Sequence, residues 1–132
     1  MAGIEWIVEA WGCNPETLRD LKAMQELFAC IVQDLDLHPC GQDQWRQFPQ
    51  SMGITGLCLL SESHLACHTF PEHGTLCLNL FCCRPRPEWD FSGQLRRLCG
   101  AQKISVRRLE RPYLGLEGNP AEFSLAGGRK AQ

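Results

Sequence analysis

The chain has 132 residues, with 13 lysines and arginines, 15 aspartates and glutamates and a formal net charge of −2. A chain of this length forms one domain with a usable core, and its basic residues are scattered, which excludes the charged surface that nucleic acid or a membrane requires. We therefore expect a small-molecule site or a protein partner.

The distribution of apolar residues and cysteines predicts a cytoplasmic protein. No apolar run approaches the roughly 20 residues of a membrane helix, and the first residues lack the basic start and apolar core of a signal peptide. The nine cysteines are odd in number and include no C-x-x-C pair of the kind that binds zinc. We expect reduced thiols, most of them small core residues.

A β-prone run that starts at Ile4 predicts a first strand, which ends at a turn. Asn14 and Pro15 follow as an N-cap and a first helical residue, and apolar residues then recur at helical spacing. This spacing predicts a helix from about Pro15 to Asp34, with its apolar stripe against a sheet.

Strands dominate the middle of the chain. Apolar runs predict four of them, over residues 45–48, 54–60, 64–70 and 75–81, then a helix over 88–98 and a final strand over 104–109. This order predicts an α/β (α+β) fold, a two-layer sandwich with a mainly antiparallel sheet and two helices packed on one face. Residues 1–110 would form a single domain, and residues 111–132, rich in glycine, proline and polar residues, a flexible tail.

Residues 61–72, with the sequence SESHLACHTFPE, gather two histidines, two carboxylates and a serine between them in an otherwise apolar region. The segment resembles the processing site of bacterial and archaeal pyruvoyl-dependent S-adenosylmethionine decarboxylases, in which Glu-Ser-His is followed without a gap by His-Thr-aromatic-Pro-Glu. Residues 81–84, FCCR, stand where that family has Phe-Thr-Cys-Gly. Nearer the start, Glu9, Trp11, Cys13 and Asn14 stand for an acidic residue, an aromatic, a cysteine and an aspartate of the family, the last with an amide in place of the carboxylate. The resemblance covers about residues 4–110.

The resemblance implies that the chain cleaves itself. In the family, the serine hydroxyl attacks the carbonyl before it, and the resulting ester eliminates to leave a pyruvoyl group on the new N-terminus. Carried over, Ser63 attacks Glu62 and gives a β chain of residues 1–62 and an α chain of residues 63–132. The pyruvoyl group is then the covalent cofactor, because its ketone takes an amine into a Schiff base and accepts electrons as carbon dioxide leaves. Neither a metal nor pyridoxal phosphate is expected.

The resemblance also assigns roles to individual residues. His68 becomes the base that removes the serine Cα proton, Cys83 the acid that protonates the decarboxylated carbon, and Thr55 stands for a serine that assists processing. Phe48 matches an aromatic that stacks on adenine, and Glu72 a carboxylate that binds the ribose hydroxyls. The chain departs from the family's usual residues at Met52 (tyrosine), Thr55 (serine), Phe70 (tryptophan), Asn79 (aspartate), Cys82 (threonine) and Arg84 (glycine). The set for self-cleavage is therefore better preserved than the substrate pocket.

The spacing of the histidines on a strand carries two conclusions. His64 and His68 would lie roughly 13 Å apart, too far to share a zinc ion. Ser63 and His68 would lie roughly 16 Å apart on opposite faces, beyond direct proton transfer. If both act on one serine, they come from different chains. This agrees with the family, whose bacterial members are homodimers of αβ protomers with two composite active sites.

The leading hypothesis is a pyruvoyl-dependent carboxy-lyase that decarboxylates S-adenosylmethionine to the aminopropyl donor for spermidine. One alternative keeps the cofactor and self-cleavage but acts on L-ornithine or L-arginine, as some proteins similar to the family do. Another is an unprocessed paralogue that serves as a binding or regulatory subunit. The retained Phe48 and Glu72 favour the nucleoside substrate, and the intact Ser63, His68 and Cys83 favour an enzyme.

Overall fold

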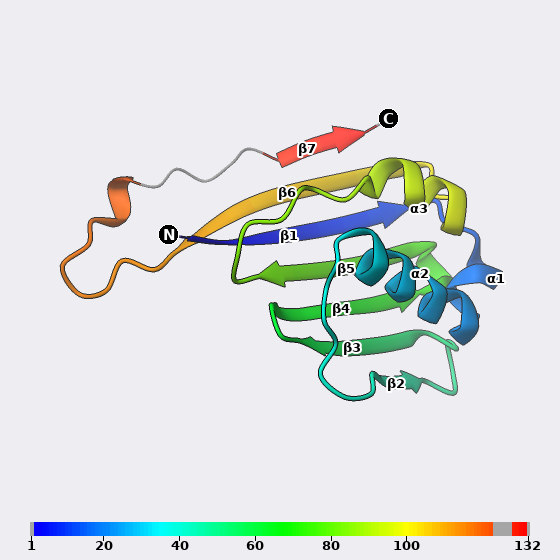
Figure 1. The fold of residues 1–132 in the computed structure, drawn as a ribbon. Helices are drawn as coiled ribbons and strands as arrows, with labels where there is room; N and C mark the ends of the chain where they lie inside the picture. Colours follow the sequence, from blue (N-terminus) through cyan, green and yellow to red (C-terminus); the bar gives the residue numbers. More distant parts are fainter. Residues whose placement is uncertain (1, 123–127, 132) are drawn as a thin grey trace.

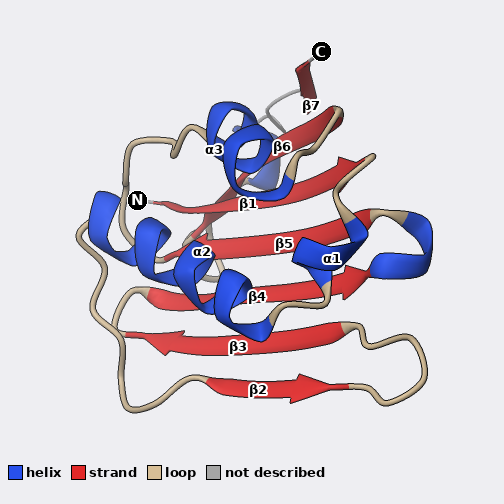
Figure 2. Ribbon diagram, turned by 90° about the vertical axis from the view of Figure 1, so that its right-hand side faces the viewer, coloured by secondary structure: helices blue, strands red, loops and turns tan. Residues whose placement is uncertain are grey.

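The computed structural model describes residues 2–122 and 128–131, and it shows one antiparallel sheet with helices on one of its faces (Figures 1 and 2). The sheet has seven strands in the order β2-β3-β4-β5-β1-β6-β7. The strands are β1 (Ala2–Trp11), β2 (Gln44–Gln47), β3 (Ile54–Leu60), β4 (Ser63–Phe70), β5 (Thr75–Cys82), β6 (Lys103–Pro112) and β7 (Gly128–Ala131). The predicted two-layer sandwich is confirmed.

The first predicted helix is in fact two helices. α1 (Pro15–Leu18) ends after one turn, and α2 (Leu21–Asp34) begins anew. The break occurs because the Asp20 carboxylate accepts from the backbone N–H of Lys22 at 3.0 Å and of Ala23 at 3.3 Å, which makes Asp20 an N-cap. Apolar spacing continues across this break, so periodicity alone predicted one helix.

The second predicted helix also starts later than expected. α3 (Phe91–Cys99) begins after Asp90, whose side chain accepts from the Gly93 N–H at 3.0 Å, and it ends at Gly100 with a φ of +67°. Two short 3₁₀ helices, η1 (Pro71–His73) and η2 (Pro120–Glu122), complete the elements. Within residues 2–122 and 128–131, the structure therefore has three α-helices instead of the two expected, with α1 supplying the additional turn.

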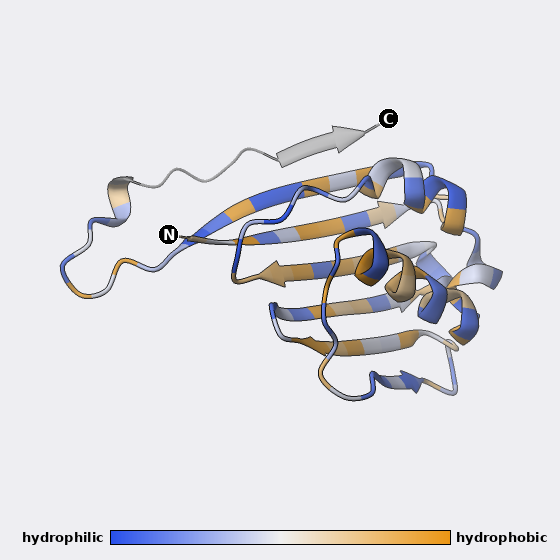
Figure 3. Cartoon of the chain, viewed as in Figure 1, coloured by the Kyte–Doolittle hydropathy of each residue, from blue (hydrophilic) through white to orange (hydrophobic). Residues whose placement is uncertain are grey.

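The core lies between the helices and one face of the sheet. Hydrophobic and hydrophilic residues alternate along several strands (Figure 3). Alternate residues of β1, β4 and β5 point into it, among them Trp6, Leu65 and Leu80. Met24, Phe28 and Ile31 of α2 are at most 1% exposed. Because strand side chains alternate between faces, the other half of the strand residues lies on the face without helices. We call this the open face.

The segment predicted to be a tail contains secondary structure. β6 continues to Pro112, η2 follows, and β7 pairs antiparallel with β6 from Ile104↔Ala131 to Arg107↔Gly128. Part of the glycine-rich end, Gly127, lies outside the described residues. The segment expected to be a flexible tail thus includes a strand that the sequence patterns did not predict, because backbone pairing along the edge of β6 is available to almost any sequence. No helix among the described residues is long and apolar enough to cross a membrane.

Candidate active site

The predicted cleavage point lies at the tight hairpin between β3 and β4. Leu60 and Ser63 are cross-strand partners, so Ser61 and Glu62 form the connecting turn. Ser63 has a φ of +147°, a range that side chains rarely occupy and that costs about 1–3 kcal/mol where the surrounding structure enforces it. The backbone is therefore strained at the residue that follows the Glu62 carbonyl.

The Glu62 carbonyl is itself held in place. It accepts a hydrogen bond from the Cys83 N–H at 2.7 Å, because β5 runs beside β4 and pairs Cys82 with Ser63. A backbone N–H directed at a carbonyl oxygen stabilises the negative charge that develops when a nucleophile attacks the carbonyl carbon. The structure thus brings Cys83 next to Glu62 and Ser63, although it follows them by about 20 residues in the sequence.

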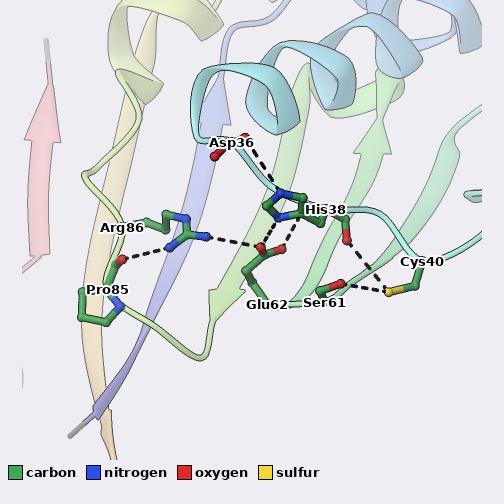
Figure 4. A network of polar contacts seen from close by, with 7 residues as sticks. All are labelled: Asp36, His38, Cys40, Ser61, Glu62, Pro85 and Arg86. Carbon is green, nitrogen blue, oxygen red and sulfur yellow. Dashed lines mark hydrogen bonds and ion pairs between the residues drawn. The ribbon is translucent and has the colours of Figure 1, made fainter.

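The Glu62 side chain is buried, although it ends in a carboxylate. Its Oε1 accepts from the His38 backbone N–H at 3.0 Å, and its Oε2 lies 2.6 Å from His38 Nδ1 and 3.3 Å from Arg86 Nη2 (Figure 4). Burial raises the pKa of Glu62, but the hydrogen bonds from His38 outweigh it and the net shift is downward. The same hydrogen bond raises the pKa of His38. Glu62 is therefore held as a carboxylate.

His68 and Thr55 form a second group, farther along the hairpin. They are cross-strand partners on β4 and β3, and Thr55 Oγ1 lies 3.0 Å from His68 Nδ1. A hydroxyl at this distance fixes the orientation of the ring and of its free nitrogen, Nε2. His68 is exposed on the open face, so its ring is accessible to an incoming group.

The two groups lie at different ends of β4. Ser63 is its first residue and His68 its sixth, a separation of about 16 Å at 3.3 Å per residue. This part of the prediction holds. The expected placement on opposite faces stays a prediction: Ser63 pairs with the buried Leu60 and Cys82, whereas His68 is exposed on the open face. Ser63 also borders a cavity of about 380 Å³ whose other residues lie on the open face. They are Glu5, Leu59, His64, Phe81 and Arg111.

Phe48 and Glu72 lie just after β2 and β4, respectively, toward the His68 end of the hairpin. Phe48 follows β2 and is 42% exposed, with the Arg46 guanidinium 5.3 Å from its ring centroid. Glu72 is exposed in η1, directly after β4. Both side chains are free to meet a ligand from outside the chain, and neither belongs to the group around Ser63.

The comparisons with known proteins identify the family of this chain. Residues 4–112 match the family model described as S-adenosylmethionine decarboxylase. The chain belongs to this family. It is similar to the S-adenosylmethionine decarboxylase proenzyme of Geobacillus kaustophilus, with 28% identity over 118 residues that cover 88% of this chain and 92% of that protein. A proenzyme of the same name from a Geobacillus species is 33% identical over the same shares of the two chains.

A solved structure supports the fold independently. The crystal structure of the adenosylmethionine decarboxylase from Aquifex aeolicus superposes with a TM-score of 0.74, at 24% identity, and covers 89% of this chain and 97% of that one. The family match over residues 4–112 and the similar proenzymes confirm the predicted family and the predicted decarboxylase. Neither the ornithine or arginine alternative nor the regulatory-subunit alternative gains support.

Three residues around the candidate site were missed by the sequence analysis. They are His38 and Arg86, which bind the Glu62 side chain, and Tyr113, whose hydroxyl donates to the Cys83 carbonyl at 2.9 Å. No motif marks them, because each reaches the site from a loop or strand end far away in the sequence. Tyr113 also lies just beyond the expected domain boundary at residue 110.

His64 is part of a polar network on the open face. Its Nε2 lies 2.8 Å from Asn79 Oδ1, and the Asn79 amide donates to Glu5 at 2.8 Å. The ring also stacks on Phe81 at a centroid distance of 5.9 Å. Over the described residues, no group of three histidines, cysteines or carboxylates is arranged to hold a metal ion.

Proposed function

We propose that this protein cleaves itself between Glu62 and Ser63 and uses the resulting pyruvoyl group to decarboxylate S-adenosylmethionine, giving the aminopropyl donor for spermidine. The observation that carries the proposal is the junction itself. A strained Ser63 follows a carbonyl that already accepts a hydrogen bond from the Cys83 N–H at 2.7 Å.

The nine unpaired cysteines suit a reducing compartment such as the cytoplasm.

Cleavage begins with the Ser63 hydroxyl. Its oxygen attacks the Glu62 carbonyl carbon, the peptide C–N bond breaks, and the Ser63 nitrogen takes a proton as the ester forms. The Cys83 N–H stabilises the transient oxyanion. A base then removes the Ser63 Cα proton, the Cβ–Oγ bond breaks and Glu62 departs as a carboxylate. An enamine remains at residue 63. Water hydrolyses it, and its nitrogen leaves as ammonia.

The residues around Ser63 fit the group that these steps would leave there. A pyruvoyl group supplies a carbonyl that takes up the substrate amine and accepts the electrons released as carbon dioxide leaves. Cys83 is held beside it by the β5 pairing and by Tyr113, and its thiol is a suitable donor of the proton that replaces carbon dioxide. His68 holds its imidazole toward the open face, oriented by Thr55.

A homodimer would unite the two groups that one chain keeps apart. A two-fold axis through the open faces could place the His68 end of one hairpin against the Ser63 end of the other. The open face carries exposed apolar residues suited to burial in such an interface. They include Leu57 at 48%, Leu59 at 64% and Phe70 at 40% exposure. Large exposed apolar surfaces of this kind are typical of interfaces.

In this dimer, the residue after β2 and the η1 segment of the second protomer would complete the substrate pocket. Phe48 offers an exposed aromatic ring for adenine, and Glu72 offers two acceptor oxygens for the ribose hydroxyls. Both lie at the His68 end of β4, so they would reach the Ser63 of the other protomer together with His68.

The test combines mass and product. Purified protein is incubated until its intact mass stops changing, then offered S-adenosylmethionine, ornithine and arginine separately while carbon dioxide release is followed. We expect fragments 1–62 and 63–132, the second with a blocked N-terminus, and activity on S-adenosylmethionine. Ser63→Ala should give one intact, inactive chain because the attacking oxygen is gone. A folded wild-type protein that stays uncleaved would contradict the proposal.

A further inference from the structure

The side chain of Glu62 is held by two loops that belong to neither strand of its hairpin. His38 lies in the connection between α2 and β2, and Arg86 in the connection between β5 and α3 (Figure 4). Building on the proposed self-cleavage, we propose that His38 and Arg86 are positioning residues for that reaction. They fix Glu62 for attack by Ser63 and neutralise its side chain as its main-chain carboxylate departs. We call the two side chains the Glu62 clamp.

The geometry shows why the clamp acts on the reacting bond. Glu62 is 6% exposed, and its side chain receives three hydrogen bonds, two from His38 and one from Arg86. Its carbonyl receives a fourth, from the Cys83 N–H. A residue fixed at its side chain and at its carbonyl has little freedom to rotate away. The clamp therefore helps to maintain the +147° φ at Ser63.

The second role concerns charge. Elimination breaks the Cβ–Oγ bond of Ser63 and leaves its electron pair on the main-chain carboxylate of Glu62, so this one residue then carries two carboxylates. Repulsion between them opposes the step unless cations lie nearby. Arg86 supplies a permanent positive charge, and His38 supplies another when it is protonated. Asp36 Oδ1, 4.0 Å from His38 Nε2, offsets part of the His38 charge, which makes Arg86 the stronger contributor.

The first experiment measures the rate of self-cleavage in freshly refolded precursor by intact mass. Arg86→Ala should slow cleavage roughly tenfold or more, as expected for losing a hydrogen bond to a buried charge. Arg86→Lys, which keeps the cation, should recover a large part of the rate. His38→Ala should have a smaller effect, because the backbone N–H of residue 38 can still donate to Glu62. Arg19→Ala, which removes an exposed ion pair with Glu16, is the matched control and should cleave normally.

The second experiment tests whether the effect passes through the Glu62 charge. Glu62→Gln keeps the shape of the side chain and removes its negative charge. In that background Arg86→Ala should slow cleavage at most about twofold, so the two changes should be strongly non-additive. Equal slowing by Arg86→Ala in both backgrounds would overturn the clamp, as would wild-type rates for both Arg86→Ala and His38→Ala.

Folding is controlled separately. The same changes are made in a Ser63→Ala chain, which cannot cleave, and its unfolding midpoint is measured. If Arg86→Ala lowers this midpoint severely, the comparison of Arg86→Lys with a neutral Arg86→Gln decides the matter, because only a charge effect separates them. The failures are distinguishable. A wild-type chain that never cleaves refutes the proposed function, whereas one that cleaves without dependence on residues 38 and 86 refutes only the clamp.

Discussion

Thr55 and His68 face each other across β3 and β4, with the threonine Oγ1 3.0 Å from the histidine Nδ1. This contact fixes the ring of the proposed elimination base by a hydroxyl on the neighbouring strand. The family usually has a serine at this position, and the threonine keeps its hydroxyl while adding a methyl group. Strand register places residue 55 directly opposite residue 68, within hydrogen-bonding reach of a hydroxyl side chain.

Removing this hydroxyl should slow self-cleavage. In Thr55→Val the side chain keeps its shape and loses the hydrogen bond, and we expect roughly a tenfold lower rate, measured by intact mass. Thr55→Ser keeps the hydroxyl and should cleave at least as fast as the wild type. If the valine variant were as fast as the serine variant, His68 would not need an oriented ring.

The shared site can be tested by complementation. Ser63→Ala and His68→Ala chains should each remain uncleaved alone. When they are refolded together, a heterodimer has one site that combines an intact Ser63 with an intact His68, so the His68→Ala chain should be cleaved. Isotope labelling of one chain identifies by mass which of them is cut. Heterodimers that form without any cleavage would place both residues in a single-chain site.

The substrate pocket should depend on an aromatic ring at residue 48. Phe48→Ala removes a stacking face worth about 1 kcal/mol beyond area burial, so turnover of S-adenosylmethionine should fall roughly fivefold or more. Phe48→Tyr keeps the ring and serves as the control. Full activity of an alanine variant that has cleaved normally would argue against stacking at this position.

Glu72→Gln should also lower turnover of S-adenosylmethionine. A charged acceptor that meets two ribose hydroxyls becomes a weaker and partly mismatched one. Self-cleavage should be unaffected, because Glu72 is exposed in η1 and the Glu62 clamp does not include it. Separate measurements of cleavage rate and of kcat/KM check both halves of this prediction. A slower cleavage would place Glu72 in the processing machinery instead.

The Glu62–His38 pair should give the uncleaved precursor a characteristic pH dependence. Glu62 has a lowered pKa, so its contribution to stability is full above its ordinary value of 4.5 and is lost as pH falls through the lowered pKa. His38 has a raised pKa, so its contribution is full below its ordinary value of 6.5 and is lost as pH rises through the raised pKa. The two contributions overlap between pH 4.5 and 6.5.

Urea unfolding of the Ser63→Ala precursor checks this dependence, with and without His38→Ala. The difference in the free energy of unfolding should be largest at about pH 5.5 and smaller at about pH 9, where the His38 imidazole is neutral. An unchanged difference across this range would mean that the pair contributes as a neutral hydrogen bond only.

Local sequence patterns were sufficient for most of the secondary structure. Short apolar runs identified β3 and β4, and alternation identified β5, all nearly to the residue, because each strand packs one face on the helices. The same patterns failed at Asp20, where one capping carboxylate divides a continuous apolar stripe into two helices. They gave no sign of β7, whose pairing with β6 rests on backbone groups that no side-chain pattern reports.

By itself, the sequence determined the family and most of the order of strands and helices, and it supplied the proposed cleavage point, since these follow from contiguous motifs and short-range periodicity. Only the tertiary structure decided what surrounds the cleavage point. The Cys83 N–H reaches the Glu62 carbonyl through the β4–β5 pairing, and His38 and Arg86 reach its carboxylate from two separate loops. Such contacts depend on strand register and loop closure between residues about 20 or more apart, and no local preference of the chain encodes them.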